Sequence, residues 1–356
     1  MTRARDQIIS LDDTPYYHCM ARCVRRAYLF GEDSVTGRSF DHRKAWVVDK
    51  LGFLSDVFSI DVCAYAVMSN HYHVVLRVDA LAAQSWSERE VIDRWTSLFA
   101  GNVLVGRYLA GEATTKAELA KVSEFVATWR ARLMDISWFM RVLNESIARQ
   151  ANEEDDCKGR FWEGRFKSQA LLDEAAVLAC MAYVDLNPVR AGIEELPEDS
   201  DFTSIQARID ELSARGVGRP KRSEQSNHNN SVKTSENKKS ITTHKPKLYP
   251  FNGGFALNDD EKSIPFSLQD YLELIDWTGR AIRDDKRGAI PEKAPPILQR
   301  IGFSELKWLD FVPRIEKSFT HAVGNRESLS SYAARNDLAW VRGVGVDGLV
   351  SVNGSF

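Results

Sequence analysis

Apolar residues recur at strand spacing in three segments near the N-terminus and at helix spacing between the first two. Residues 16–24, 62–68 and 71–78 are rich in β-branched and aromatic residues, and Ser69-Asn70 forms a polar break between the last two. These patterns predict three strands, the second and third joined by a tight turn. Within residues 40–57 the spacing is that of an amphipathic helix, carried by Ala45, Val48, Leu51, Leu54 and Val57. The predicted order is strand, helix, strand, strand.

Helical patterns dominate the residues that follow. In residues 81–132, polar residues followed by acidic ones predict two helices, which we expect to form an excursion beside the core and to carry no chemistry. Residues 136–150 carry an apolar stripe typical of a core helix. Asp173 precedes a strongly apolar helix, and Pro188 disfavours helical geometry at the residue before it. This last helix should therefore end within a turn of Tyr183.

The character of the chain changes again after residue 212. Residues 216–247 are rich in Ser, Asn, Lys and Thr, and they contain eight Lys and Arg against two Glu, a net charge of +6. Such a segment cannot enter a core, so we expect a basic polar linker over 213–262. Apolar residues at helical spacing return afterwards, which predicts a small helical domain over 263–340 and a weakly ordered tail over 341–356. The first 212 residues would form the main domain.

Composition limits the classes of protein to consider. The 356 residues are 44% hydrophobic, which is ample for a sizeable core, and the net charge is −3. Affinity for nucleic acid must therefore come from local basic patches. The five cysteines include no C-x-x-C pair, and the chain has neither a signal peptide at its start nor a run of about 18 apolar residues. We expect a cytoplasmic protein without a membrane partner.

The first candidate for chemistry is the pair His71 and His73. Residues two apart on a strand point to the same face, so the two imidazoles lie together while Tyr72 faces away. Paired imidazoles can share one divalent cation, with a third ligand from elsewhere in the chain. The helical zinc-protease motif, His-Glu-x-x-His, is not matched. The alternative is that both are ordinary strand histidines.

The second candidate is a basic, aromatic stretch at residues 158–167. Its composition is typical of surfaces that hold phosphates and stack bases. Near the N-terminus a second basic run has the same capacity to grip phosphate. The candidate nucleic-acid contacts are Arg22, Arg25, Arg26, Arg160, Phe161, Trp162, Arg165 and Lys167. An ordinary strand with cation–π contacts, or a solvated edge, would explain the same residues.

The third candidate is Tyr183 with Asn187. The two are four residues apart and share one helix face unless the helix has already unwound between them. A phenol and a carboxamide would then project from the same place. A buried helix also often carries a tyrosine at its polar end, which is the simpler explanation of Tyr183 taken alone.

Taken together, these motifs resemble those of the REP-associated tyrosine transposases, a branch of the single-tyrosine HUH transposases. The resemblance covers roughly residues 14–205. It rests on the ordered motifs Tyr17-His18-Cys-Met-Ala-Arg22, Val67-Met-Ser-Asn-His-Tyr-His-Val-Val-Leu76, Gly159-Arg-Phe-Trp-Glu-Gly-Arg-Phe-Lys167 and Tyr183-Val-Asp-Leu-Asn-Pro-Val-Arg-Ala-Gly192. The combination is far more specific than any single motif.

The resemblance implies an α+β fold with a ferredoxin-like antiparallel sheet and packed helices, the HUH endonuclease fold. It further implies that His71, His73 and Asn187 bind Mg²⁺ or Mn²⁺, and that Tyr183 attacks single-stranded DNA to form a 5′-phosphotyrosine intermediate. Hairpins of the REP type are the expected DNA. The helical domain at 263–340 resembles the extension of longer family members, and the chain could act as a monomer or as a homodimer.

Two other functions are compatible with the sequence. One is a domesticated DNA-binding protein that keeps the fold but does not turn over, although the presence of His71, His73 and Tyr183 argues against it. The other is a ferredoxin-like RNA-binding module, which explains the basic aromatic stretch but gives the histidines and Tyr183 no role.

Overall fold

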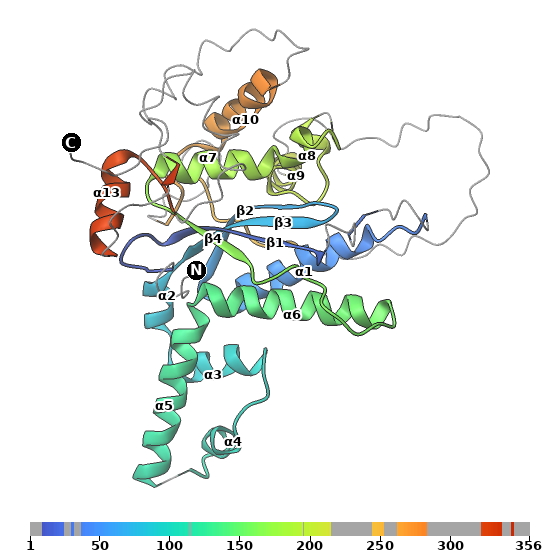
Figure 1. The fold of residues 1–356 in the computed structure, drawn as a ribbon. Coiled ribbons are helices and arrows are strands. Elements are labelled where there is room, and N and C mark those ends of the chain that lie inside the picture. The colour runs from blue at the N-terminus through green and yellow to red at the C-terminus, as the bar shows by residue number, and fades with distance from the viewer. Residues whose placement is uncertain are drawn as a thin grey trace.

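A sheet with the strand order β2-β3-β1-β4-β5-β6 forms the centre of the molecule (Figure 1). The computed structural model describes residues 9–24, 30–31, 37–113, 115–194, 196–214, 244–252, 262–282, 322–336 and 343–344. The four main strands, which pair antiparallel, are β1 (Tyr16–Arg22), β2 (Ile60–Val67), β3 (His71–Val78) and β4 (Lys167–Leu171). Helices connect β1 to β2 and β3 to β4, so the arrangement is the ferredoxin-like βαββαβ unit. The predicted fold class is confirmed.

Helices cover both faces of this sheet. Helix α1 (His42–Val57) and helix α6 (Ile136–Glu154) pack on one face, where Tyr72 enters the larger core cluster. Helix α7 (Glu174–Asp185) crosses the other face, where it packs with strand residues such as Val75 in the second cluster (Figure 1). Tyr72 lies between His71 and His73 in sequence, so the alternation along β3 directs the two histidines toward α7.

The excursion between β3 and α6 contains four helices instead of the predicted two. They are α2 (Ala80–Ser85), α3 (Glu88–Thr96), α4 (Val103–Leu109) and α5 (Lys116–Leu133), and they extend away from the sheet (Figure 1). The prediction was wrong because α2 and α4 are shorter than two full turns and show little periodicity. Their starts are fixed by the side chains of Asp79 and Asn102, which accept hydrogen bonds from the backbone. In the ranges that the structure describes, no helix is both long and apolar enough to span a membrane.

Helix α7 begins and ends where the sequence predicts. The Asp173 side chain accepts a hydrogen bond from the Ala176 backbone N–H at 2.8 Å, which caps the start. The helix ends at Asp185, and the short helix α8 (Asn187–Arg190) follows with Pro188 in its first turn. Tyr183 therefore lies in the last turn of α7.

The elements that follow α7 pack against the central sheet and against α7 itself. The 3₁₀ turn η3 (Pro197–Asp199) and helix α9 (Ser204–Ala214) are followed, after an interval outside the described residues, by helix α10 (Leu268–Ile282), which contacts α7 and α8. Beyond a second interval, strand β5 (Ala322–Val323), helix α13 (Arg326–Arg335) and strand β6 (Gly343–Val344) follow.

Two short strands from the C-terminal region extend the sheet at its β4 edge. Strand β5 pairs parallel with β4, and β6 pairs parallel with β5. The region predicted as a helical domain thus contributes the helices α10 and α13 and also strands to the central sheet. The domain boundaries themselves stay a prediction, and most of the predicted linker lies outside the described residues.

A buried carboxylate, Asp185, connects α7 to both α9 and α10. It accepts hydrogen bonds from the Ser204 hydroxyl, from the Ile205 backbone N–H at 2.9 Å and from the Tyr271 hydroxyl at 2.6 Å. Burial raises the pKa of Asp185 to about 6. The buried guanidinium of Arg208 lies nearby and donates to the backbone carbonyls of Cys63 and Tyr249. These contacts hold the end of α7, next to Tyr183, against the rest of the chain.

Replacement Tyr271→Phe is predicted to lower the free energy of unfolding by about 1–3 kcal/mol, because Asp185 stays buried and loses one of its three donors. Urea denaturation followed by circular dichroism measures this. The matched control is Tyr108→Phe, which removes an exposed hydroxyl whose contact with Glu88 is 3.4 Å long. Equal destabilisation by the two variants would contradict the role assigned to Asp185.

Candidate active site

The register of three strands places the candidate side chains in rows on the face that α7 covers. Met20 of β1 lies opposite His73 of β3 and opposite Lys167 of β4, while Arg22 lies opposite His71. Directly opposed residues of antiparallel strands point to the same face. Lys167 and Arg22 therefore share the face of the two histidines.

The next row along β1 adds a third histidine. His18 lies opposite Val75 on β3 and opposite Gln169 on β4. Its Nε2 lies 2.9 Å from His73 Nδ1, and the two rings stack with centroids 5.1 Å apart. His73 in turn has its ring centroid 5.0 Å from that of His71. The sheet thus carries a contiguous group of three imidazoles.

Hydrogen bonds orient the two predicted metal ligands. His71 Nδ1 donates to Asn70 Oδ1 at 2.6 Å, and His73 Nδ1 makes the contact with His18. Among the described residues, neither Nε2 of His71 nor that of His73 makes a hydrogen bond. Metal-binding histidines usually show this pattern, with one nitrogen fixed by the protein and the other left for the ion.

The three imidazoles are neutral at physiological pH. Burial lowers the pKa of His18 to about 4, and burial followed by the charge of Arg22 lowers the pKa of His71 to about 4. For His73, burial and then the neighbouring histidines hold the pKa well below its usual value. Neutral imidazole is the form that binds a metal ion, so the donor set fits Mg²⁺ or, better, Mn²⁺.

The remaining metal ligands would have to be oxygen atoms. In the part of the chain that the structure describes, no three His, Cys, Asp or Glu side chains are grouped so that they could hold a metal. Asn187, the predicted third ligand, is 8% exposed at the start of α8, and its carboxamide makes no hydrogen bond to any described residue. Its role toward a metal stays a prediction.

Tyr183 lies against the histidine group. Its ring centroid is 5.4 Å from that of His73 and 6.0 Å from that of His18, in edge-to-face geometry. The guanidinium of Arg190, on α8, lies 5.1 Å from the same ring. Tyr183 is 2% exposed, so it faces the space between the sheet and α7. The structure therefore brings together Tyr183, His71 and His73, as the sequence predicts.

Arg22 is a half-buried cation whose guanidinium is only partly satisfied by the described chain. Its Nε is inaccessible to solvent and has no hydrogen-bond partner there. An unsatisfied guanidinium N–H in a desolvated place is costly unless an anion joins it. Its position opposite His71 makes a phosphate group the fitting anion.

The basic stretch before β4 divides into buried aromatic and exposed basic residues. Phe161 and Trp162 are 4% and 8% exposed, and both rings pack against Phe30 in the larger core cluster. Arg160 and Arg165 are exposed and form no hydrogen bond or ion pair within the described residues. The accessible part of this stretch is thus its charge. Arg25 and Arg26 lie outside the described residues.

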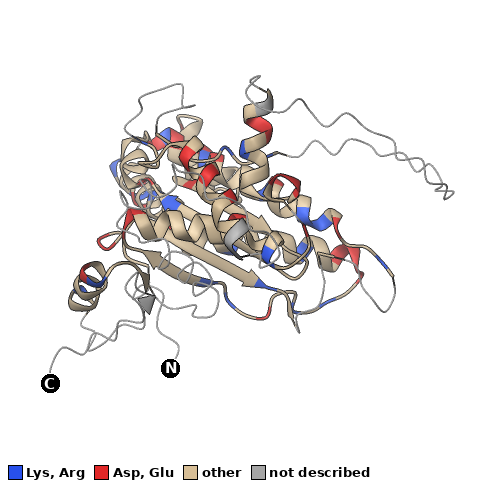
Figure 2. Ribbon diagram, turned by 90° about the horizontal axis from the view of Figure 1, so that it is seen from above, with Lys and Arg blue, Asp and Glu red and all other residues tan. Residues whose placement is uncertain are grey.

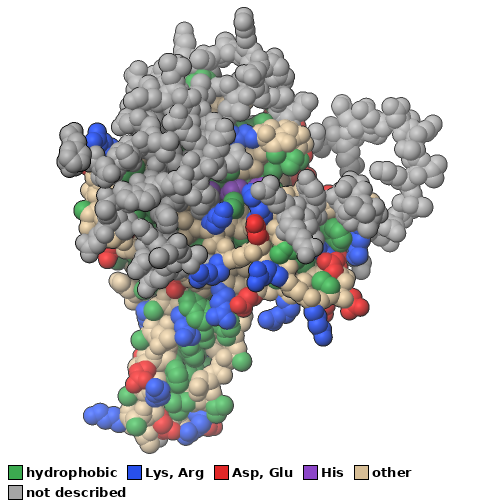
Figure 3. All heavy atoms as spheres, viewed as in Figure 1, with side chains coloured by type: hydrophobic (Ala, Val, Ile, Leu, Met, Phe, Trp, Pro, Cys, Tyr) green, Lys and Arg blue, Asp and Glu red, His purple; other side chains and the backbone are tan. Residues whose placement is uncertain are grey.

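Charges of both signs are interspersed on the ribbon of the described residues (Figure 2). On the face shown in Figure 3, however, histidine atoms reach the surface, and Lys and Arg side chains lie between them and the helices below. On this face, basic side chains therefore lie next to histidine.

Sequence reasoning missed the roles of His18 and Arg190. Nothing in the local sequence of His18 reveals a contact with a residue 55 positions away. Arg190 lies about two helical turns beyond Tyr183, on the separate helix α8, and its contact with the ring depends on how α8 follows α7.

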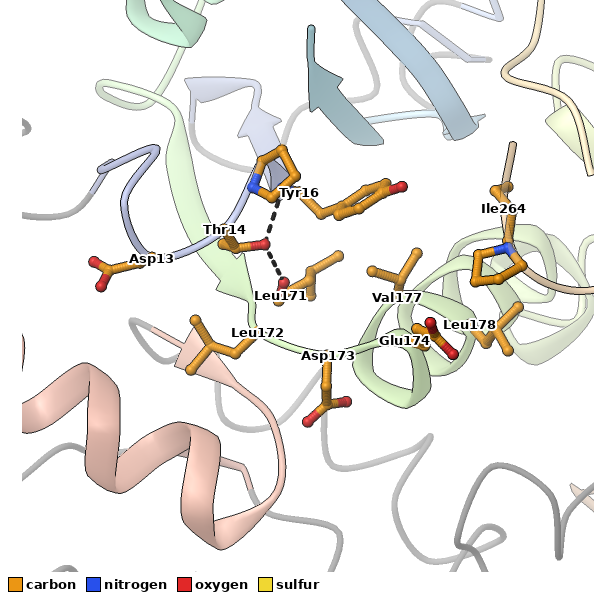
Figure 4. A pocket seen from close by; sticks show the side chains of 12 residues that line it. Asp13, Thr14, Tyr16, Leu171, Leu172, Asp173, Glu174, Val177, Leu178 and Ile264 are labelled. Carbon is orange, nitrogen blue, oxygen red and sulfur yellow. Dashed lines mark hydrogen bonds between the residues drawn. The ribbon is translucent and has the colours of Figure 1, made fainter. Parts of the chain in front are cut away.

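A separate apolar pocket lies at the other end of β1 and α7. It has a volume of about 210 Å³ and is lined by side chains that include Tyr16, Leu171, Val177 and Ile264 (Figure 4). The Thr14 hydroxyl in its wall donates to the Leu171 carbonyl at 2.6 Å. None of the candidate site residues lines this pocket.

Comparison with known proteins gives little direct guidance. No family model matches the chain, and no curated protein matches it. One similar solved structure bears the description "Structure of the REP associates tyrosine transposase bound to a REP hairpin". The similarity has a TM-score of 0.34 at 14% identity and covers 62% of this chain and 89% of the other. At this level it carries no argument about the site.

We predict that His71→Ala and His73→Ala each weaken Mn²⁺ binding by more than about 100-fold, because each removes one metal ligand. Loss of a residue that only hydrogen-bonds to a ligand typically weakens metal binding by about 10–100-fold. Isothermal titration calorimetry measures the affinity. The control is His42→Ala, which removes a histidine that pairs with Glu154 on the opposite face of the sheet. Unchanged Mn²⁺ affinity in both strand variants would exclude the metal site.

Replacement His18→Leu should weaken Mn²⁺ binding by about 10–100-fold while leaving both ligands in place, since it removes only the partner of His73 Nδ1. The same titration, together with a thermal melt to confirm folding, measures the effect. A folded variant with the affinity of the unmodified chain would show that His18 does not position His73.

Proposed function

We propose that this protein is a metal-dependent transposase or nickase that cleaves and rejoins single-stranded DNA, with Tyr183 as the nucleophile. The observation that carries the proposal is the position of the Tyr183 ring, 5.4 Å from that of His73 and edge-on to it. The position places the phenol ring directly beside one of the two predicted metal ligands. Tyr183, His71 and His73 all come from one copy of the chain.

Mg²⁺ or Mn²⁺, held by His71 and His73 with Asn187 as a further oxygen ligand, would polarise a non-bridging oxygen of the scissile phosphate and stabilise the charge that develops there. The hydrogen bond that His71 donates to Asn70 and the contact of His73 with His18 would hold both imidazoles in orientation for the ion. Either Mg²⁺ or Mn²⁺ can be the native metal, since imidazole ligands favour Mn²⁺ and cellular abundance favours Mg²⁺.

Tyr183 supplies the covalent step. Its hydroxyl oxygen forms a bond to phosphorus, the bond from phosphorus to the 3′ oxygen breaks, and the departing oxygen takes up the proton that the phenol loses. The products are a 5′-phosphotyrosine and a free 3′-hydroxyl. A phenol, with a pKa of about 10, is a good leaving group, so the same step can run backward when a 3′-hydroxyl attacks. Rejoining follows without an external energy source.

Basic residues around the histidines would hold the DNA backbone. Arg22 and Lys167 share the face of His71 and His73 and lie on the same side of the pair, on β1 and β4. Arg160 and Arg165 extend this charge along the surface. Arg190, over the Tyr183 ring, favours the phenolate that forms when the covalent intermediate is reversed.

Hairpin DNA is the substrate to test first. The similar solved structure is described as bound to a REP hairpin. A DNA-binding protein without turnover is the second candidate, because the exposed Arg160 and Arg165 would serve binding whether or not Tyr183 reacts.

The test uses labelled single-stranded hairpin oligonucleotides from the flanks of the protein's own gene, incubated with Mn²⁺ or with EDTA and run on a denaturing protein gel. We expect a metal-dependent covalent adduct that is lost completely in Tyr183→Phe, because the variant keeps the ring but lacks the attacking oxygen. Tyr108→Phe, in the helical excursion, should form the adduct at the normal rate.

An adduct that persists in Tyr183→Phe would exclude this nucleophile. Tight hairpin binding without any adduct in the unmodified chain would favour the binding protein, and preferential binding of RNA of the same sequence would favour the RNA-binding module.

A further inference from the structure

A groove lies between α6 and the segment that leads into β4, on the side of the sheet away from Tyr183. It has a volume of about 420 Å³. Its lining includes Trp138, Arg141 and Asn144 from α6 and Gly164, Arg165 and Phe166 from the facing segment. None of the histidine-site residues contributes to it, so the groove is a separate feature of the surface.

An aromatic ring flanked by arginines forms one wall of the groove. The guanidinium carbons of Arg132 and Arg141 lie 4.5 and 5.1 Å from the centroid of the partly exposed Trp138 ring. On its inner side the ring contacts Trp95 edge-on, with centroids 5.5 Å apart. The contact with Trp95 thus fixes the orientation of the Trp138 ring. The guanidinium of Arg141 over this ring adds a second flat surface on which a base can stack.

The positive charge at the rim is available to a ligand. Arg165 is exposed and makes no hydrogen bond or ion pair with any described residue. Arg141 makes one ion pair, with Glu145 at 2.8 Å, and both side chains are more than half exposed. An exposed pair of this kind contributes only about 0–1 kcal/mol, so a phosphate can replace Glu145 at little cost.

The groove is connected to the histidine site by the segment that forms its far wall. Within this segment, the Glu163 backbone N–H donates to the Arg22 carbonyl at 2.8 Å, and the Phe161 carbonyl accepts from Val24 at 3.0 Å. The segment therefore passes the end of β1, beside Arg22, and continues through Gly164 into the groove. A DNA strand that follows it meets the exposed basic side chains of Arg160 and Arg165.

We propose that this groove binds the single-stranded DNA that continues from the scissile phosphate, with one unpaired base stacked on Trp138 and Arg141 and with Arg165 on the backbone. The proposal rests on the proposed function, because it takes DNA as the substrate. The groove offers an aromatic ring, Trp138, and two arginine side chains, Arg141 and Arg165. This combination suits a nucleotide better than an apolar peptide.

The experiment compares the affinity of the full chain for a hairpin with and without single-stranded extensions, by fluorescence anisotropy in EDTA so that no cleavage occurs. We expect the extended hairpin to bind more tightly. Trp138→Leu should weaken binding of the extended hairpin about 5- to 100-fold, the effect of losing one stacked base, and should leave the bare hairpin unaffected.

Two further variants keep the proposal testable if Trp138→Leu fails to fold. Gly164→Leu adds a bulky side chain to the groove lining at a position where a Cβ meets no atom within 4 Å, and should likewise abolish the preference for the extended hairpin. Arg165→Glu should weaken binding and reduce the slope of log affinity against log salt by about 0.7 for each phosphate that the protein no longer neutralises. Trp138→Leu should leave that slope unchanged.

Arg89→Glu is the matched control, because Arg89 is an exposed arginine with one ion pair on α3, away from the groove. If Arg165→Glu and Gly164→Leu bind the extended hairpin no more weakly than Arg89→Glu, the groove is not a DNA site. Absence of hairpin binding by the unmodified chain would instead overturn the proposed function. The two failures are therefore distinguishable.

Discussion

The register that pairs β1 with both β3 and β4 is the constraint on which the candidate site depends. Because Met20 lies opposite both His73 and Lys167, and Arg22 lies opposite His71, the face toward α7 collects imidazoles and cations from three strands. A shift of one residue along β1 would turn His18 and Arg22 to the opposite face and leave His73 without its hydrogen-bond partner. The chemistry thus depends on the same backbone pairing that builds the sheet.

Burial then decides the chemical state of these groups. Imidazoles removed from water stay neutral, which suits metal binding, whereas a guanidinium in the same surroundings keeps its charge and needs an anion. The site therefore combines neutral donors for a cation with a fixed charge for a phosphate. Asp185 and its donors from α9 and α10 hold the end of α7 in place, so the C-terminal region fixes the position of Tyr183 from behind.

Local features of the chain were predictable from sequence, and contacts between distant segments were not. The first three strands, the shared face of His71 and His73 and the end of α7 follow from side-chain alternation and from Pro188. The contact of His18 with His73 depends on strand register, and the burial of Phe161 and Trp162 depends on Phe30, more than 100 residues earlier. Composition alone describes a basic aromatic stretch, and only packing shows that the aromatics belong to the core.

Anomalous diffraction from crystals soaked in Mn²⁺ tests the central claim most directly, because it locates the ion relative to the side chains. We predict one strong peak within about 2–2.5 Å of Nε2 of both His71 and His73, on the side that faces Tyr183. A peak elsewhere, or full occupancy of another site with none between the two histidines, would contradict the claim that these strands and α7 form a metal-dependent catalytic centre.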